Sequence, residues 1–260
     1  TWDENVHYSG LKSQLNVMST WWTENSSIDF RSVNGDLAFY GAVSLFPSYF
    51  ISSFFSATDS ELAKEIYRHG IHATAFASYL LSVFFVYRAL RISTDNKGIP
   101  LAAAILLASF PLWLGYGFFN YKDMPTAAFA TMAIYAGAGL LKGADAKSIH
   151  TYTALLCLAT ILEAGTKLAA LALIIPPWAV LIFILLKERR YLTLQSAILI
   201  TALGCMLITP VSWPDPVGFL FSALELMSKH PWPGCVLSNS DLMCPSHTNW
   251  SAARYLSTWY

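Results

Sequence analysis

The sequence predicts an all-α protein whose helices cross a membrane several times. Of its 260 residues, 55% are hydrophobic and only 12% are charged, whereas a typical soluble protein carries about 25% charged residues. Residues 99–121 and 168–186 contain no charged side chain, and each run is close to the ~20 residues that a helix needs to cross a bilayer. No strands are expected, because an open sheet cannot satisfy its edge groups in lipid.

About six spans make up the predicted transmembrane core, which covers residues 70–210. Charged or proline-containing segments separate apolar runs at residues 70–87, 99–119, 124–141, 151–162, 168–186 and 192–208. The run at 151–162 is short for a span unless its helix begins near Ile149. Together with the next run it is expected to form a helical hairpin that turns at residues 163–167.

Two outer loops flank this core in the predicted topology. Residues 1–69 form the first loop, and they include a juxtamembrane segment at residues 37–57. Pro47 and the many Ser, Tyr and Phe residues of that segment favour a helix in the membrane interface over a span. Residues 211–260 form the second loop, which is rich in Trp and Pro, with a short interfacial helix expected at residues 219–227.

Basic loops predict the orientation of the core. Lys and Arg gather at residues 88–97, 142–147 and 187–190, and two spans separate each loop from the next, so all three fall on one side. An excess of Lys and Arg marks the cytoplasmic side. The polar turns at residues 120–123, 163–167 and 213–215 then share the opposite side. Ionisable groups close to a bilayer are costly, which favours a functional site there.

The turn at residues 118–125 reads Phe-Phe-Asn-Tyr-Lys-Asp-Met-Pro. Pro125 fits the first turn of the helix that follows, and Asp123 can cap that helix by accepting a bond from a free N–H. Two interpretations stand: a helix-capping turn between two membrane helices, or an active-site loop at the membrane surface. Lys122 and Lys167 are likewise either lysines that reach the lipid headgroups or cations for a bound phosphate.

A second acidic group opens the chain. Asp3 and Glu4 are adjacent, and His7 follows. One of the carboxylates can act as a general base on a hydroxyl within hydrogen-bond reach, while the other binds a metal or an arginine; the alternative is a solvated acidic helix start. His7 is a candidate metal ligand, but no spacing of His, Cys and carboxylates forms a strong metal signature, so the metal is unknown.

Charge and cysteine content add two weaker constraints. The formal net charge is zero, so nothing indicates binding to nucleic acid. Cys157 and Cys205 lie inside apolar runs, where cysteine is usually a small buried hydrophobe. Cys235 and Cys244 lie in a polar loop and can pair if that loop faces an oxidising compartment, a question that their spacing leaves open.

The ordered set of motifs resembles the membrane glycosyltransferases of the GT-C fold, and most closely their protein O-mannosyltransferase-like branch (glycosyltransferase family 39 and its bacterial relatives). Asp3-Glu4 with His7 resembles the acidic motif of their first loop. Residues 118–125 resemble an Asn-Pro-Lys-Asp-x-Pro turn, with Tyr121 in place of the proline. Residues 165–167 resemble a Gly-x-x-Lys stretch, and residues 213–216 a proline-tryptophan exit. Residues 249–259 resemble a Pro-Trp-x-Tyr-x-x-x-Trp segment, with Asn249 in place of the proline.

The resemblance implies an enzyme that moves a sugar from a polyprenyl-phosphate donor to a hydroxyl of a protein, lipid or glycan. It implies an integral protein of the bacterial inner membrane or the endoplasmic reticulum, with its site on the periplasmic or lumenal side. Asp3 would be the base, Glu4 would position the acceptor or a metal, and Asp123 would complete the acidic site. Cations on the donor phosphate would stabilise the leaving group; these are Arg68, Lys122 and Lys167. The residues that would contact the acceptor or belong to its loop are His7, Asn120, Trp250 and Tyr255.

Several points stay open at this stage. The stereochemistry of transfer is undecided, and a divalent cation is a candidate cofactor. Family members have a helix before the position of Asp3, so the chain is expected to be a fragment. One alternative is a non-catalytic scaffold subunit of a larger membrane complex with a degenerate transferase fold, in which Asp3 and Asp123 would be far apart or salt-bridged away from any cavity. A transporter would need ionisable residues near mid-bilayer, whereas the charges here lie at the ends of spans.

Overall fold

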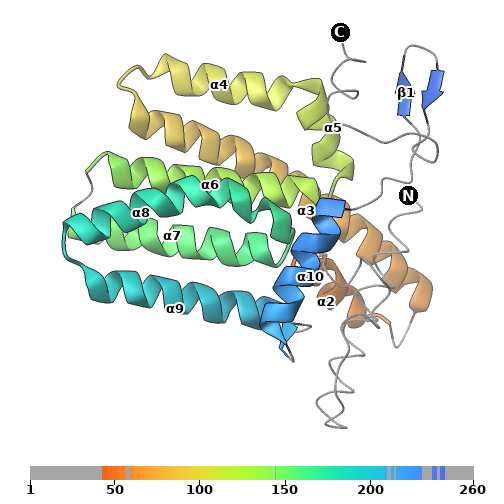
Figure 1. Ribbon diagram of the computed structural model, residues 1–260. Coiled ribbons are helices and arrows are strands. Elements are labelled where there is room, and N and C mark those ends of the chain that lie inside the picture. Colours follow the sequence, from red (N-terminus) through yellow and green to blue (C-terminus); the bar gives the residue numbers. More distant parts are fainter. Residues whose placement is uncertain are drawn as a thin grey trace.

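The computed structural model describes residues 43–56, 59–143, 145–209, 212–213, 215–229, 236–238 and 241–243. Helices that run side by side make up most of this part of the chain (Figure 1). In chain order they are α2 (Phe46–Ser53), α3 (Ser60–Ser93), α4 (Gly98–Ser109), α5 (Pro111–Phe119), α6 (Asp123–Leu141), α7 (Ala146–Ala164), the 3₁₀ helix η3 (Leu168–Ile174), α8 (Ile175–Lys187), α9 (Tyr191–Ile208) and α10 (Pro216–Lys229). Two short antiparallel strands, β1 (Val236–Ser238) and β2 (Asp241–Met243), follow α10.

Four helical stretches in the described part of the chain are long and apolar enough to cross a membrane: α3, α6, residues Ala170–Lys187 of η3 and α8, and α9. The pair α4–α5 makes a fifth if it is counted as one span, although the chain bends by 62° between its two helices. The chain is therefore an α-helical membrane protein, as the sequence predicts.

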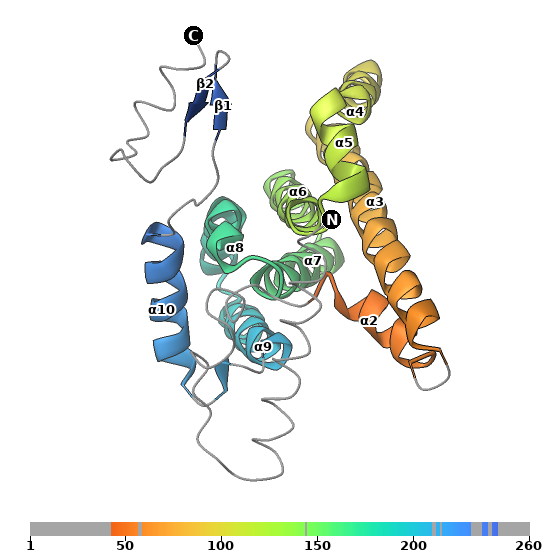
Figure 2. The ribbon, with the colours of Figure 1, turned by 90° about the vertical axis from the view of Figure 1, so that its right-hand side faces the viewer.

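The remaining expected span corresponds to α7. This helix begins at Ala146 and has 19 residues, so the run at 151–162 gains the length that it lacks by itself. Helix α7 is not among the helices that are apolar enough to cross a membrane by themselves, and its position explains this. It packs against both α6 and α9 (Figure 2), so fewer of its side chains need to suit lipid.

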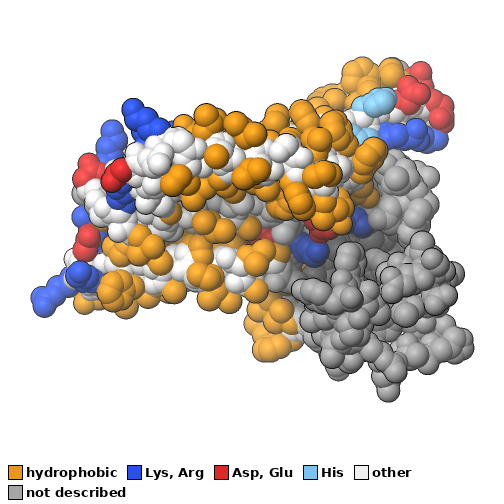
Figure 3. Space-filling model, turned by 90° about the horizontal axis from the view of Figure 1, so that it is seen from above, with side chains coloured by type: hydrophobic (Ala, Val, Ile, Leu, Met, Phe, Trp, Pro, Cys, Tyr) orange, Lys and Arg blue, Asp and Glu red, His pale blue; other side chains and the backbone are white. Residues whose placement is uncertain are grey.

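The loops that connect α3 to α4, α6 to α7 and α8 to α9 lie at one end of the helices (Figure 1). Lys and Arg side chains gather at this end (Figure 3), which we call the basic end. The 19 residues of α6 reach about 28 Å at 1.5 Å per residue, close to the ~30 Å of a bilayer core. The opposite end carries the turns from α5 to α6 and from α7 to η3.

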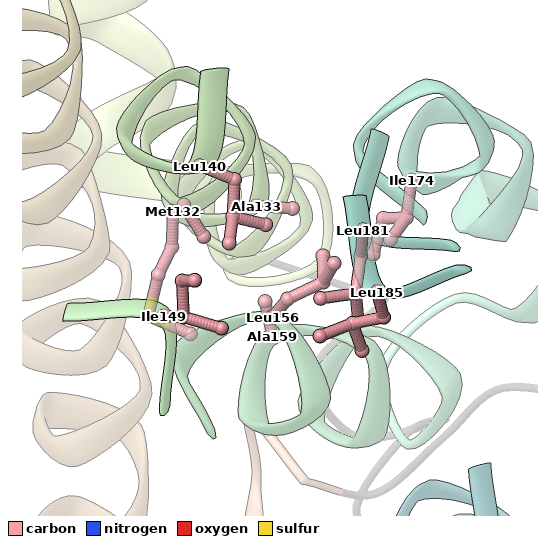
Figure 4. Packing of buried hydrophobic residues seen from close by; sticks show 10 residues of the cluster. Met132, Ala133, Leu140, Ile149, Leu156, Ala159, Ile174, Leu181 and Leu185 are labelled. Atoms are coloured by element: carbon pink, nitrogen blue, oxygen red, sulfur yellow. The ribbon is translucent and has the colours of Figure 1, made fainter. Parts of the chain in front are cut away.

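Helix α6 is the centre of the molecule, with α3 on one side and α7 and α8 on the other (Figure 2). Two thirds of its apolar stretch (67%) is buried inside the protein, against 11% for α9. One buried cluster joins α6, α7, η3 and α8 (Figure 4); it consists of Met132, Ala133, Ala136, Leu140, Ile149, Leu156, Ala159, Ile174, Leu181 and Leu185.

Glycines let the helices around α6 come close. A Cβ on Gly137 would stand 3.3 Å from the Cα atom of Pro177 in α8, and one on Gly139 would meet the ring of Tyr152 in α7. Small residues of this kind are typical of helix interfaces in membranes, because they allow close backbone approach where lipid provides no hydrophobic driving force.

Helix α3 begins well before the span predicted at residues 70–87. The charged segment before residue 70 forms its first turns, since Asp59 Oδ1 accepts hydrogen bonds from the N–H groups of Glu61 (2.9 Å) and Leu62 (3.0 Å). This N-cap starts the helix, and nothing interrupts it before Ser93. The end of the predicted first loop and the first predicted span therefore share one continuous helix.

Pro111 explains the break between α4 and α5. Proline lacks an N–H and clashes with the preceding helical turn, and Phe110 before it is extended, with ψ of 117°. Such a break leaves helix carbonyls without their usual donors, and the hydroxyl of Tyr79 in α3 donates to the carbonyl of Ala108 at 2.7 Å. Residues 99–119 are expected as one span, and the structure divides them into two helices bent by 62°.

Helix α2 has eight residues, far fewer than the ~20 of a span. It starts with Pro47 in its first turn and packs on α3. Beneath it lies a second buried cluster, made of Leu45, Tyr67, Ile71, Ala75 and Tyr121. The described part of the juxtamembrane segment at residues 37–57 is thus a short helix lying against α3.

The strands β1 and β2 are a correction to the expectation of no strands. Val236 pairs with Met243, and Ser238 with Asp241, in the Trp- and Pro-rich region after the core. The argument against open sheets applies only to chain surrounded by lipid, so it does not exclude a hairpin there. The interfacial helix expected at residues 219–227 is longer than predicted and forms α10.

Candidate functional site at the end opposite the basic loops

Asn120 organises the turn between α5 and α6. Its Oδ1 atom accepts hydrogen bonds from the backbone N–H groups of Lys122 (3.2 Å) and Asp123 (2.8 Å). Its Nδ2 atom donates to Oδ2 of Asp123 at 2.9 Å. One amide side chain therefore satisfies free N–H groups at the start of α6 and also holds the carboxylate of Asp123 in place.

Asp123 does not cap α6, contrary to the expectation from the sequence. It is the first residue of the helix, and Asn120 accepts from its backbone N–H. The carboxylate of Asp123 is thereby left for other partners. Pro125 does lie in the first turn of α6, where its missing N–H costs no hydrogen bond.

Lys167, in the turn after α7, is the main partner of that carboxylate. Its Nζ atom donates to Oδ1 of Asp123 at 2.9 Å, across a separation of 44 residues. The exposed fraction is 37% for the side chain of Lys167 and 47% for that of Asp123. Ion pairs with this exposure contribute at most about 1 kcal/mol, so a ligand can replace either partner at low cost.

Tyr121 ties this turn to the rest of the fold. It is buried in the cluster under α2, at the position where the resembled turn has proline. The Nζ atom of Lys122 lies 5.8 Å from the centre of the Tyr121 ring, and its charge acts on Asp123 together with that of Lys167. Two cations thus surround one carboxylate at the start of α6.

Glu163 is a buried carboxylate beside the ion pair, and sequence reasoning did not assign it to the site. Its side chain is fully buried, and neither carboxylate oxygen has a hydrogen-bond partner among the described residues. Its backbone carbonyl accepts from the N–H groups of Thr166 (3.0 Å) and Lys167 (2.8 Å). A carboxylate that ends an apolar run is costly near a bilayer, and this signal was present in the sequence.

Three separate segments meet around the same end. The N–H of Val43, just before α2, donates to the carbonyl of Gly165 at 3.0 Å. A Cβ on Gly165 would also stand 3.0 Å from Ile208 at the end of α9. Trp213 follows, and its Nε1 atom donates to the carbonyl of Met206 at 2.7 Å. The turn at residues 163–167 is therefore held from both sides.

The structure brings together Asn120, Asp123 and Lys167 out of the predicted site, with Lys122 adjacent to them. Arg68 is exposed on α3, a different element from the two turns that hold Asp123 and Lys167. The other predicted residues lie outside the described part of the chain; they are Asp3, Glu4, His7, Trp250 and Tyr255. The predicted meeting of Asp3 with Asp123 therefore stays a prediction.

The predictions of a metal site and of a disulfide also stay predictions. Within the described ranges, no three His, Cys, Asp or Glu side chains gather as metal ligands do, and the proposed ligands near the start of the chain are not among them. Cys157 and Cys205 are free, in α7 and α9. Cys235 and Cys244 lie outside the described residues.

Neither a protein family, nor a curated protein, nor a solved structure matches the chain. The fold and the polar end define a class of protein at a general level: an α-helical membrane protein with a half-exposed carboxylate–lysine pair where its spans end. Any finer assignment rests on the chemistry of that end.

Proposed function

We propose that the chain is a membrane glycosyltransferase, which moves a sugar from a polyprenyl-phosphate donor to a hydroxyl of a protein, lipid or glycan acceptor. The observation that carries the proposal is the pair formed by Asp123 and Lys167, half exposed at the end of the spans opposite the basic loops. The resemblance to GT-C enzymes of the O-mannosyltransferase-like branch adds the reaction type. In this proposal the site faces the periplasm or the lumen.

The chemistry of transfer needs both kinds of charge. A carboxylate within hydrogen-bond reach can take the proton of the acceptor hydroxyl as its oxygen attacks the sugar. Cations can stabilise the charge that grows on the departing phosphate. Asp3 and Asp123 are the proposed acidic groups, with Glu4 positioning the acceptor or a divalent cation. Lys167, Lys122 and Arg68 are the proposed phosphate contacts, and a phosphate would draw Lys167 away from Asp123.

A scaffold subunit without catalysis is the second candidate, and one observation favours it. It predicts that Asp3 and Asp123 are far apart or salt-bridged away from any cavity, and Lys167 does bind Asp123. One further observation favours the enzyme: both side chains keep more than a third of their exposure.

The test is sugar release from a lipid donor. The purified chain in nanodiscs is supplied with radiolabelled undecaprenyl-phosphate mannose or dolichyl-phosphate mannose, and transfer or hydrolysis of the label is followed. Removal of a general base or of a charge at the leaving group lowers rates by about 10²–10⁴-fold, so Asp123→Asn and Lys167→Met should each lose most of the activity. Lys147→Met, at the other end of α7, is the matched control and should retain it.

The scaffold alternative predicts a different result. The wild-type chain would then release no more label than Asp123→Asn, although both melt at the same temperature. That outcome would overturn the proposed transferase.

A further inference from the structure

The buried carboxylate of Glu163 requires an explanation. An ionised carboxylate removed from water is strongly disfavoured unless it is paired and hydrogen-bonded, and burial by itself favours the neutral form. Glu163 is fully buried, with both side-chain oxygens unpaired among the described residues. It must therefore either hold a proton or have a cation within reach.

The cation within reach is Lys167. It follows Glu163 by four residues, and its backbone N–H donates to the carbonyl of Glu163 at 2.8 Å, so both side chains start from the same turn. The charge that acts on the carboxyl of Glu163 is that of Lys167. Among the helices packed on α7 at this end, α6 adds Asp123 beside Lys122, and α9 adds the titratable thiol of Cys205. Residues 168–186 of η3 and α8 carry no charge.

We propose that Asp123, Lys167 and Glu163 form a proton-linked triad, in which Lys167 pairs with whichever of the two carboxylates is ionised. In the observed arrangement Asp123 is ionised and bound to Lys167, and Glu163 holds a proton. In the alternate arrangement Asp123 has taken up a proton, Glu163 has released one to water, and the ammonium of Lys167 has moved to Glu163. The three groups have zero net charge in both arrangements.

The exchange is feasible because the starting pair is exposed and the alternate pair is buried. An exposed ion pair is weak, so Lys167 leaves Asp123 easily, and Asp123 keeps its hydrogen bond from Asn120. In the buried site a charge pair interacts more strongly, since the local dielectric is low. Any ligand or proton that neutralises Asp123 therefore moves Lys167 toward Glu163.

The triad goes beyond the proposed function, because it predicts the behaviour of three side chains whatever reaction the chain performs. It can thus be tested without turnover. The readout is the rate at which the amine of Lys167 is acetylated at pH 8, followed by mass spectrometry in detergent and compared with Lys187 at the basic end.

The amine of Lys167 is expected to stay protected from acetylation unless both carboxylates are changed. Glu163→Gln leaves Asp123 as partner and should change the rate ratio by less than about twofold. Asp123→Asn leaves the buried partner Glu163, so it should not raise the ratio. The double variant leaves Lys167 without either carboxylate partner, and its amine should react up to about fivefold faster, because a weak ion pair no longer holds it.

Two outcomes would overturn the triad. If Asp123→Asn by itself raises the rate as much as the double variant, Glu163 is no partner of Lys167. If Glu163→Gln by itself raises it, Asp123 does not hold Lys167 in the resting protein. Thermal unfolding and gel filtration establish that each variant is folded.

A second measurement needs no change at Glu163. A carbodiimide couples a carboxylate to an adjacent amine as an amide, with loss of one water. In Asp123→Asn the coupling should join Lys167 to Glu163 within one peptide, whereas in the wild type it should join Lys167 to Asp123. Absence of the Glu163 product in Asp123→Asn would also overturn the proposal.

Discussion

At the scale of single residues, Asn120 does more than any other side chain to shape the polar end. Its amide oxygen satisfies two backbone N–H groups and its amide nitrogen holds Asp123. Aspartate at this position would keep the acceptor but place a second carboxylate against Asp123. The choice of asparagine therefore serves both the helix start and the ion pair.

Asn120→Ala should destabilise the protein by about 1–3 kcal/mol, since it removes a capping acceptor and a hydrogen bond to a charged group. The measurement is thermal unfolding of purified protein in detergent. Asn96→Ala is the control: Asn96 also accepts from a backbone N–H, that of Gly98 at 2.8 Å, but it lies in an exposed loop and binds no carboxylate of the described residues. An equal loss in both variants would mean that the bond to Asp123 contributes nothing.

At the scale of elements, the contact between α2 and α3 supports the turn at residues 120–123. Gly70 in α3 faces Ser48 in α2, and a Cβ there would stand 2.8 Å from Cβ of Ser48. The cluster that holds Tyr121 lies under the same contact. A short helix thus supports the polar end from below, although it cannot cross the membrane.

Gly70→Ala should push α2 away from α3 and lower stability by about 1–3 kcal/mol, the usual effect of overpacking. Gly115→Ala is the matched control, because a Cβ on Gly115 meets nothing within 4 Å and alanine is the better helix former. Thermal unfolding of the two variants compares them directly. Equal melting temperatures would show that α2 is not closely packed on α3.

At the scale of the whole molecule, the separation of charge along the helices predicts a fixed orientation in the membrane. The three basic loops share one end (Figure 1), and the Asp123–Lys167 pair lies where α6 begins, at the other. Loops rich in Lys and Arg stay on the cytoplasmic side during insertion. The pair should therefore face the periplasm or the lumen.

Accessibility to a membrane-impermeant maleimide tests this orientation. In a background without the four native cysteines, Asn96→Cys and Lys147→Cys should be labelled from the same side of sealed vesicles. Ser56→Cys, next to α2, should be labelled from the opposite side. Labelling of all three from one side would contradict the topology, and with it the side proposed for the site.

The length of apolar runs determined most of the fold class. The thickness of a bilayer sets how many apolar residues a span needs, so the runs at residues 124–141 and 192–208 correspond closely to α6 and α9. The same reasoning predicted the hairpin that turns at residues 163–167, and it set the condition that the helix of α7 begins before residue 151. Alternation of spans also placed the three basic loops at one end without any knowledge of packing.

Only the tertiary structure decided what those spans bring together. Run length does not state which helices are neighbours. The bond from Lys167 to Asp123 across 44 residues could therefore not be predicted from the sequence, although both turns were expected on one side. The burial of Glu163 depends in the same way on the segments that cover the end of α7. The hydrogen bond from Tyr79 in α3 to the carbonyl of Ala108 before the bend also depends on which helices are neighbours. Apolar length is a local property matched to the bilayer, whereas these contacts depend on lateral packing between helices.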